Sequence, residues 1–543
     1  MAKKYKFLIL IYFLTSISIY SQNTVGTILN STASYNAYTL FTVSKETYLI
    51  NNCGQVINKW SSDYNSGKSV YLLENGNLLR ASAGPNPGNI AIPGIGGRIE
   101  IFDWEGNVLW QYVYSNLNAS QHHDIYPMPN GNILVLAASI LTDVAAIQLG
   151  RNPSNLASNQ LYNEHILEIE PQGSDEVNVI WRWDFKDHLT QDFDSTKENF
   201  SVISENAQLM DINFLGESNG NANWMHINSV QYNENLNQII LGSKTLSEFY
   251  IIDHSTTTEE AASHSGGIYG KGGDLLYRWG NPGAYGQGDD NDQKLFGQHN
   301  PHWIPNGLLD EGKIILFNNG VHRSTPYSEV NIITPPTSEP GVYIKNANIS
   351  FGPENPDYTY TAANTTDFYS PILSSAQRLP NNNILICEGT SGRFFEIDSN
   401  NITVWEYINP ISSGTILTQG ETPVSNKVFR AKKYALNYAG FANKDLTPGD
   451  PIEIDFDISN CSTLSSAKIT LPQLTAYPNP VKDLLSINSN DLIQKIEVFS
   501  STGKKVISNY SKNEIDFSNI TQGIYHVKIY LHQKTLTKKV IKI

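Results

Sequence analysis

Apolar and polar positions alternate along most of this chain in short runs separated by polar turns, and the pattern repeats. One half of the repeat is a strand, a polar turn and a strand that ends in an aromatic residue, as at 53–60 and 103–110. The other half is a strand, an asparagine-rich turn and an apolar strand, as at 74–79 and 129–134. Such short alternation is typical of β-strands, and Asn-Gly suits a tight hairpin because both residues tolerate positive φ. The pattern therefore predicts four-stranded sheets, each built from two hairpins.

The repeat runs from Tyr48 to about Asn409, with about six copies at intervals of roughly 50 to 100 residues. Regular repetition of four-stranded sheets is typical of a β-propeller, whereas the repeats of a solenoid, the competing interpretation, are shorter and more uniform. We therefore expect an all-β fold with a six-bladed β-propeller over residues 23–445. Three long inserts are expected to form surface loops on one rim, at 138–165, 185–220 and 254–273.

The two ends of the chain differ from this repeat. Residues 1–22 combine lysines, a short apolar core and a small residue, which is typical of a secretory signal peptide, and the apolar run is too short for a stable membrane span. Residues 446–472 contain Pro, Gly and many Ser and are expected to form a linker. Residues 473–543 hold many lysines and short alternating strands, which predict a small C-terminal β-sandwich.

Charge and cysteine content narrow the possible partners. The formal net charge of -15 argues against nucleic acid, which requires a basic face, but it leaves room for a small anion in a locally basic pocket. Only Cys53, Cys387 and Cys461 are present, too few for a disulfide framework or a zinc site. One disulfide is possible, and its pairing stays open.

Histidines recur at one phase of the repeat. The position seven residues before the turn asparagine is His123, His226 and His299 in three successive repeats, Lys68 in the first and Ser374 in the last. Equivalent positions of propeller blades occupy equivalent radii and heights, so we expect the three imidazoles to meet at the mouth of the central channel. Packing of each imidazole against a tryptophan, and a zinc site, are the alternatives.

Further hydrogen-bond donors lie next to this ring in the sequence. Arg323 follows the strand after His299, and a guanidinium group is suited to binding a tetrahedral oxyanion. His122 and His302 add two more imidazoles beside the ring. These residue types predict an anion site with no cofactor and no metal.

At these residues the chain resembles the arylsulfate sulfotransferase family, over roughly residues 45–435. The matching motifs are His122-His123-Asp124-Ile125, Trp224-Met225-His226-Ile227-Asn228-Ser229, Gln298-His299, and Asn319-Gly320 leading to Arg323. The resemblance implies a six-bladed propeller that transfers a sulfuryl group from a small aromatic sulfate to a phenol through a transiently sulfated histidine. It implies that His226 and His299 bind the sulfuryl group or act as acid and base, that Arg323 clamps it, and that His123 assists.

One departure from the family concerns the nucleophile. The resemblance places the sulfated histidine about where this chain has Ser374, with Gln377 nearby, and no histidine occurs between His322 and His526. We expect Ser374 and Gln377 to contact the substrate together with His122 and His302. Either His123, His299 or His302 takes over as nucleophile, or the transferase activity is altered or lost. The alternative functions are a non-catalytic surface propeller that binds glycans or proteins, and a metal hydrolase.

The last 70 residues or so carry three further motifs in order. They are 477–483, 501–506 and 523–529. In this order they resemble the type IX secretion sorting domain of Bacteroidota. The resemblance implies export through the periplasm by the type IX secretion machinery, followed by release or attachment at the cell surface.

Overall fold

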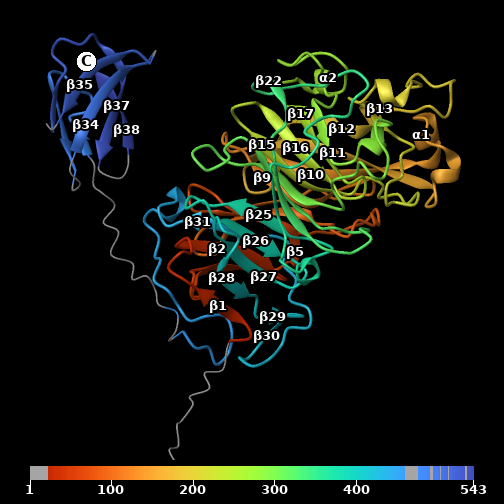
Figure 1. Ribbon diagram of the computed structural model, residues 1–543, viewed down its shortest axis with the longest axis horizontal. Coiled ribbons are helices and arrows are strands. Elements are labelled where there is room, and N and C mark those ends of the chain that lie inside the picture. Colours follow the sequence, from red (N-terminus) through yellow and green to blue (C-terminus); the bar gives the residue numbers. More distant parts are fainter. Residues whose placement is uncertain are drawn as a thin grey trace, which may run out of the picture. The chain divides into compact units, whose positions relative to one another are not determined.

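The computed structural model describes residues 23–458, 461, 475–489, 493–501, 503–510, 513–531 and 535–543, which belong to two compact units divided between residues 462 and 463. Strands dominate both units, so the predicted all-β fold is confirmed (Figure 1). The predicted signal peptide lies outside the described residues, as does most of 459–474. No helix in the described ranges is long and apolar enough to cross a bilayer.

Six antiparallel sheets of four or five strands form the described part of the first unit. The first sheet contains β31 (Lys432–Ala435), β2 (Ala37–Val43), β3 (Glu46–Ile50) and β4 (Val56–Ser61). The second contains β5 (Ser66–Leu72), β6 (Leu78–Ala83), β7 (Gly97–Phe102) and β8 (Val108–Val113). The third contains β9 (Ala119–Pro127), β10 (Ile133–Thr142), β11 (Gln160–Gln172) and β12 (Glu176–Asp184).

The remaining three sheets continue this order along the chain. The fourth contains β15 (Ile227–Asn233), β16 (Gln238–Ser243), β17 (Glu248–Asp253) and β18 (Tyr277–Trp279). The fifth contains β19 (His299–Trp303), β20 (Ile314–Asn318), β21 (Glu329–Ile333) and β24 (Tyr358–Tyr360). The sixth contains β25 (Ser375–Arg378), β26 (Ile384–Glu388), β27 (Arg393–Ile397), β28 (Thr403–Ile408) and β1 (Gly26–Asn30), which lie side by side in Figure 1.

Short elements occupy the connections between these strands. The helices are α1 (Asp143–Gln148), α2 (Thr258–Ala261), η1 (Pro153–Asn155), η2 (Phe185–Asp187), η3 (Ile203–Glu205), η4 (Pro282–Tyr285), η5 (Thr365–Asp367) and η6 (Ala439–Phe441). The strand pairs are β13 (Leu189–Thr190) with β14 (Met210–Asp211), β22 (Thr337–Glu339) with β23 (Val342–Tyr343), and β29 (Ile411–Ser412) with β30 (Thr415–Ile416).

The aromatic residue that ends each outer strand connects its sheet to the next one. Its indole nitrogen donates a hydrogen bond of 2.8 to 3.2 Å to a backbone oxygen of the following sheet or of its connections, in the pairs Trp60–Asp103, Trp110–Glu176, Trp183–Gly273, Trp279–Pro353 and Trp405–Asn52. Between the fifth and sixth sheets the Tyr358 hydroxyl donates to Asn401 Oδ1 at 2.6 Å. Buried indole N–H groups need such partners. The bonds form a closed cycle, as a β-propeller requires.

Strands from the two ends of the first unit close the cycle of six sheets. Strand β31 from the end of the first unit pairs with β2, and β1 from its start pairs with β28. The segment before β31 also bonds to the sixth sheet, where Ser374 N donates to Phe429 O at 3.1 Å and Val428 N donates to Gly389 O at 2.9 Å. This segment therefore bridges the last sheet and the first.

One predicted surface loop is wrong in its extent. Strands β10 and β11 take up both ends of 138–165, because apolar residues pair across the extended hairpin, with Ile140 opposite Tyr162 and Leu141 opposite Leu161. Only residues 143–159 connect the two strands, and they include α1.

A disulfide joins Cys53 to Cys461 and leaves Cys387 as a free, buried cysteine. Two isolated β-bridges, Gln55 to Pro451 and Thr418 to Ile454, lie in the same part of the chain. Residues 446–458, expected to begin a linker, therefore lie against the first unit.

Reduction of this disulfide is expected to lower the free energy of unfolding of the first unit by about 2 to 5 kcal/mol, because the bond closes a very long loop in the unfolded chain. Chemical denaturation with and without a reducing agent measures the effect. The Cys53→Ser/Cys461→Ser double variant serves as control and should not respond to the reducing agent. An equal response in both proteins would contradict the prediction.

The second unit contains two sheets that share one core. One sheet consists of β35 (Lys505–Tyr510), β34 (Ile493–Ser500), β37 (Gly523–Leu531) and β38 (Thr535–Lys542). The other consists of β32 (Thr475–Tyr477), β33 (Leu484–Asn488) and β36 (Glu514–Asp516). Ile487 and Ile515 of the smaller sheet pack in one cluster with Val498, Val527 and Val540 of the larger one. The unit is therefore a small β-sandwich.

Candidate functional site

The residues that share one phase of the repeat lie at irregularities of the innermost strands. The ladder shifts register between Ser66 and Val70 in β5, next to residues 122–124 in β9, just after Ile227 in β15 and just after His299 in β19. Positive φ angles accompany the shifts at Lys68 (108°), His123 (51°) and His226 (50°), and Ser374, just before β25, has a φ of 90° without a shift in the ladder. Left-handed backbone at non-glycine residues costs about 1 to 3 kcal/mol and is concentrated at functional sites, and bulges redirect side chains.

Four of these side chains line one cavity of about 740 Å³. They are Lys68, His123, His226 and His299. Lys244 and Lys427 line it as well, while no carboxylate belongs to the described lining. Burial, and then repulsion from Lys427, lower the pKa of Lys68. In a chain of net charge -15, three lysines and three imidazoles thus converge on one opening without an acidic partner in its lining.

His299 has a defined tautomer. Its Nδ1–H donates to Asn319 Oδ1 at 2.8 Å. The amide of Asn319 is fixed in this orientation because its nitrogen donates to Ser370 O at 2.7 Å and Leu373 O at 3.0 Å. Burial lowers the pKa of His299 to about 3, so the ring is neutral at pH 7 and its lone pair lies on Nε2.

His123 is connected to a second imidazole behind it. His123 Nδ1 lies 3.0 Å from His122 Nδ1, and His122 Nε2 lies 3.5 Å from Glu164 Oε2. Burial lowers the pKa of His122 to about 3 and raises the pKa of the Glu164 carboxyl well above its usual range. On the other side, the ring of His226 lies 4.8 Å from that of His123 between centroids. Both rings of the cavity wall therefore have low proton affinity, since burial also lowers the pKa values of His123 and His226.

The His123 ring packs tightly against Gly94 on one side. A Cβ atom on Gly94 would lie 2.3 Å from the His123 ring, and His123 N donates to Gly94 O at 2.7 Å. The loop between β6 and β7 therefore fixes His123 by direct backbone contact, which only glycine permits at this position.

Asp124, the residue next to His123, forms a buried ion pair with Arg430 that was not predicted from the sequence. Arg430 Nη2 lies 3.0 Å from Asp124 Oδ2, and Arg430 Nη1 donates to the Tyr71 hydroxyl at 2.8 Å. Asp124 also accepts from Val230 N at 3.1 Å, so it joins three sheets. The sequence feature that could have pointed to this ion pair is a cluster of basic residues in a chain with few charges: Lys427, Arg430, Lys432 and Lys433.

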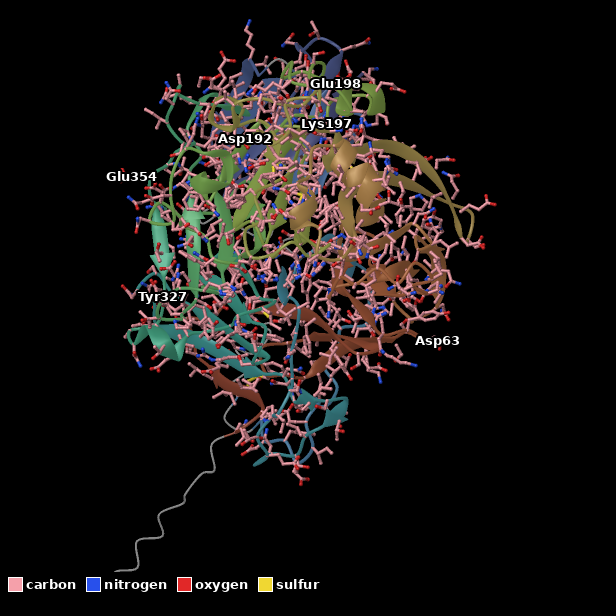
Figure 2. The ribbon with its side chains drawn as sticks, turned by 90° about the vertical axis from the view of Figure 1, so that its right-hand side faces the viewer. Asp63, Asp192, Lys197, Glu198, Tyr327 and Glu354 are labelled. Atoms are coloured by element: carbon pink, nitrogen blue, oxygen red, sulfur yellow. A yellow bond between two sulfur atoms is a disulfide. The ribbon has the colours of Figure 1, made fainter. Side chains whose placement is uncertain are left out.

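Arg323 does not line the histidine cavity. It pairs with Glu329 at 2.5 Å and lies over the rings of Phe296 and Tyr327. With these residues it lines another cavity, of about 600 Å³. Figure 2 shows Tyr327 at the outer edge of the molecule in that view. The expected clamp thus faces a carboxylate instead of the imidazoles.

The other expected contact residues also point elsewhere. The Ser374 hydroxyl donates to Ser370 Oγ at 2.9 Å and accepts from Gly389 N at 3.0 Å. The Gln377 amide exchanges two hydrogen bonds with the backbone of Lys433. His302 Nδ1 donates to Asn300 O at 2.9 Å, and His302 is not part of the cavity lining. Ile372 and Leu373 line the cavity in place of Ser374.

Two family models match the chain, one in each unit. A model of the family described as arylsulfotransferase (ASST) matches residues 11–432, and a model of the secretion system C-terminal sorting domain matches residues 475–543. No curated protein matches the chain.

Solved structures resemble the chain only at low identity. A protein of unknown function from Bacteroides caccae is 10% identical over 73% of this chain and 98% of its own, with a TM-score of 0.39. A putative 6-phosphogluconolactonase from Bacteroides fragilis is 11% identical over 74% and 99%, with a TM-score of 0.35. A virginiamycin B lyase from Staphylococcus aureus is 10% identical over 72% and 89%, with a TM-score of 0.32.

Proposed function

Because the chain belongs to the arylsulfotransferase (ASST) family, we propose that it transfers a sulfuryl group from an aryl sulfate to a phenol in the histidine-lined cavity. The C-terminal sorting domain indicates secretion to the cell surface or the outside through the type IX machinery. The observation that carries the proposal is the cavity lining, which combines neutral imidazoles with three lysines and no carboxylate. A monoanionic sulfate ester matches that charge, and imidazole is a nucleophile when neutral.

His299 is the nucleophile in this proposal. Its Nε2 lone pair attacks sulfur, a S–N bond forms, and the S–O bond to the aromatic ring breaks. The phenolate leaves with the electron pair of that bond. Asn319 holds the Nδ1 proton and disperses the positive charge that develops on the ring. Lys68 and Lys244 offset the negative charge on the sulfuryl oxygens and on the phenolate, and the exposed Lys427 attracts the anionic donor.

His226 binds a sulfuryl oxygen in this proposal, and His123 transfers protons. Asn223 Nδ2 donates to His226 Nδ1 at 2.9 Å, which leaves the His226 proton on Nε2 as a donor to a sulfuryl oxygen. His123 gives its Nε2 proton to the departing phenolate, and His122 passes its own Nδ1 proton to His123. The Glu164 carboxyl, protonated because burial raises its pKa, then supplies a proton to His122 Nε2. In the second half-reaction the acceptor phenol loses its proton to His123, its oxygen attacks sulfur, and the S–N bond breaks.

Nitrophenol release tests the proposal directly. The purified full chain, incubated with 4-nitrophenyl sulfate, should release nitrophenol faster when phenol is added as acceptor, and phenyl sulfate should accumulate in equal amount. The His226→Ala variant should lose most of this activity, because it removes a donor to the sulfuryl oxygens. Absence of release with several aryl sulfates, or an unchanged His226→Ala variant, would contradict the proposal and favour a binding role.

A further inference from the structure

Two imidazoles and a carboxylate converge on one point outside the cavity. His188 Nδ1 lies 2.9 Å from Asp274 Oδ1, and His264 Nδ1 lies 2.7 Å from the same oxygen. Within the described ranges this is the one group of three or more His, Cys, Asp or Glu side chains whose ligand atoms all lie within 4.8 Å of one another. The three imidazoles of the cavity do not form such a group. The cluster is therefore the strongest candidate for a metal centre in the described chain.

His188 is oriented as metal-binding histidines are. Its Nε2–H donates to Ala261 O, the last residue of α2, at 2.8 Å, and the ring stacks on Trp183 with an interplanar angle of 7°. A hydrogen bond from one ring nitrogen to a backbone carbonyl fixes the tautomer and leaves the lone pair of the other nitrogen for a metal. That other nitrogen is Nδ1, which faces Asp274 and is fully buried with the rest of the ring.

We propose that His188, His264 and Asp274 bind a divalent transition-metal ion such as Zn²⁺. Imidazole nitrogen with one carboxylate suits this class, whereas Ca²⁺ and Mg²⁺ prefer oxygen ligands alone. An ion at about 2.1 Å from each atom separates tetrahedral ligands by about 3.4 Å, so the separations of 2.9 and 2.7 Å from Asp274 Oδ1 have to open by about 0.5 and about 0.7 Å. His264, whose side chain is 61% exposed, has room for the larger of the two movements, and water completes the coordination.

The ion connects segments that are distant in the chain. His188 follows η2 directly after β12, whereas His264 and Asp274 belong to the insert that carries α2 and leads to β18. Figure 1 shows α2 close to β12 and β17, and α2 contacts β12. The metal therefore fixes the insert of the fourth sheet to the third sheet.

Metal titration of the tag-free, full-length protein tests the site. After treatment with a chelator, Co²⁺ should bind at about one ion per chain with the visible absorption of a tetrahedral complex, and Zn²⁺ should displace it. Ca²⁺ should not compete. The His264→Ala variant should bind Zn²⁺ at least about tenfold more weakly, because it loses one of three protein ligands. It should also lose the rise in Tm that Zn²⁺ causes in the parent.

A matched variant separates this site from adventitious binding. His322 is similarly exposed at 67% and lies 3.3 Å from a single carboxylate, Glu217, so His322→Ala should bind Zn²⁺ as the parent does. The Asp274→Asn variant is the second test, since it keeps the side-chain shape and removes the charge. Absence of stoichiometric Co²⁺ and Zn²⁺ binding, or equal affinity in His264→Ala and the parent, would overturn the proposal.

Discussion

Replacing His299 with alanine is expected to lower kcat/KM for sulfuryl transfer by at least about a thousandfold, since loss of a catalytic nucleophile has effects of this order. The neutral ring, the proton held on Nδ1 by Asn319 and the free Nε2 lone pair are the physical reasons. Steady-state kinetics with 4-nitrophenyl sulfate measure the loss. Mass spectrometry of the parent, quenched during turnover without acceptor, should find the added sulfuryl group on the peptide that contains His299.

A Lys427→Met variant and a test of folding serve as controls for the His299→Ala result. Lys427→Met leaves the imidazoles in place and removes an exposed charge from the cavity lining, so it should raise KM more than it lowers kcat. Circular dichroism should show that the His299→Ala variant is folded. A sulfuryl group found on His123 or His302, or His299→Ala activity within tenfold of the parent, would show that another residue is the nucleophile.

The repeat made the position of the imidazoles predictable from the sequence. A fixed count back from the turn asparagine reaches an equivalent place in three sheets, although the connections that follow the innermost strands differ in length (128–132, 234–237 and 304–313). His123, His226 and His299 accordingly line one cavity. The count predicts where the backbone lies but not what the side chain contacts. At the same phase, the Ser374 hydroxyl bonds to Ser370 and Gly389 and does not line the cavity.

Residues whose position depends on distant pairing were not predictable in this way. Lys427 and Arg430 reach the site because β31 crosses from the sixth sheet to pair with β2, which no local pattern reveals. Arg323 follows the strand after His299, but strand order does not determine which group its guanidinium faces. Glu329 on β21 takes that place. The family resemblance named Arg323 as a candidate but could not indicate that Glu329 is its partner.

Acidification from pH 7 to pH 5 is expected to lower the free energy of unfolding by about 6 to 7 kcal/mol. Burial lowers the pKa of His122 and His299 to about 3, and of His165 and His302 to about 4, from 6.5. Between pH 6.5 and about 4 the unfolded chain therefore binds protons that the folded chain excludes, so stability falls as the pH falls. Linkage gives about 2 kcal/mol for each ring at pH 5. Asp211, whose pKa burial raises to about 6, offsets about 1 kcal/mol.

His165 isolates one of these contributions, because it lies outside the cavity lining and is fully buried, with Nε2 2.9 Å from the Tyr114 hydroxyl. The His165→Gln variant keeps a polar partner for that hydroxyl and does not titrate, so it should lose about 2 kcal/mol less than the parent between pH 7 and pH 5. Urea denaturation at pH 7, 6 and 5 measures both proteins. Equal losses in the parent and in His165→Gln would mean that the buried ring takes up a proton as readily in the folded chain as in the unfolded chain, and the neutral state of His299, on which nucleophilic attack depends, would lose its basis.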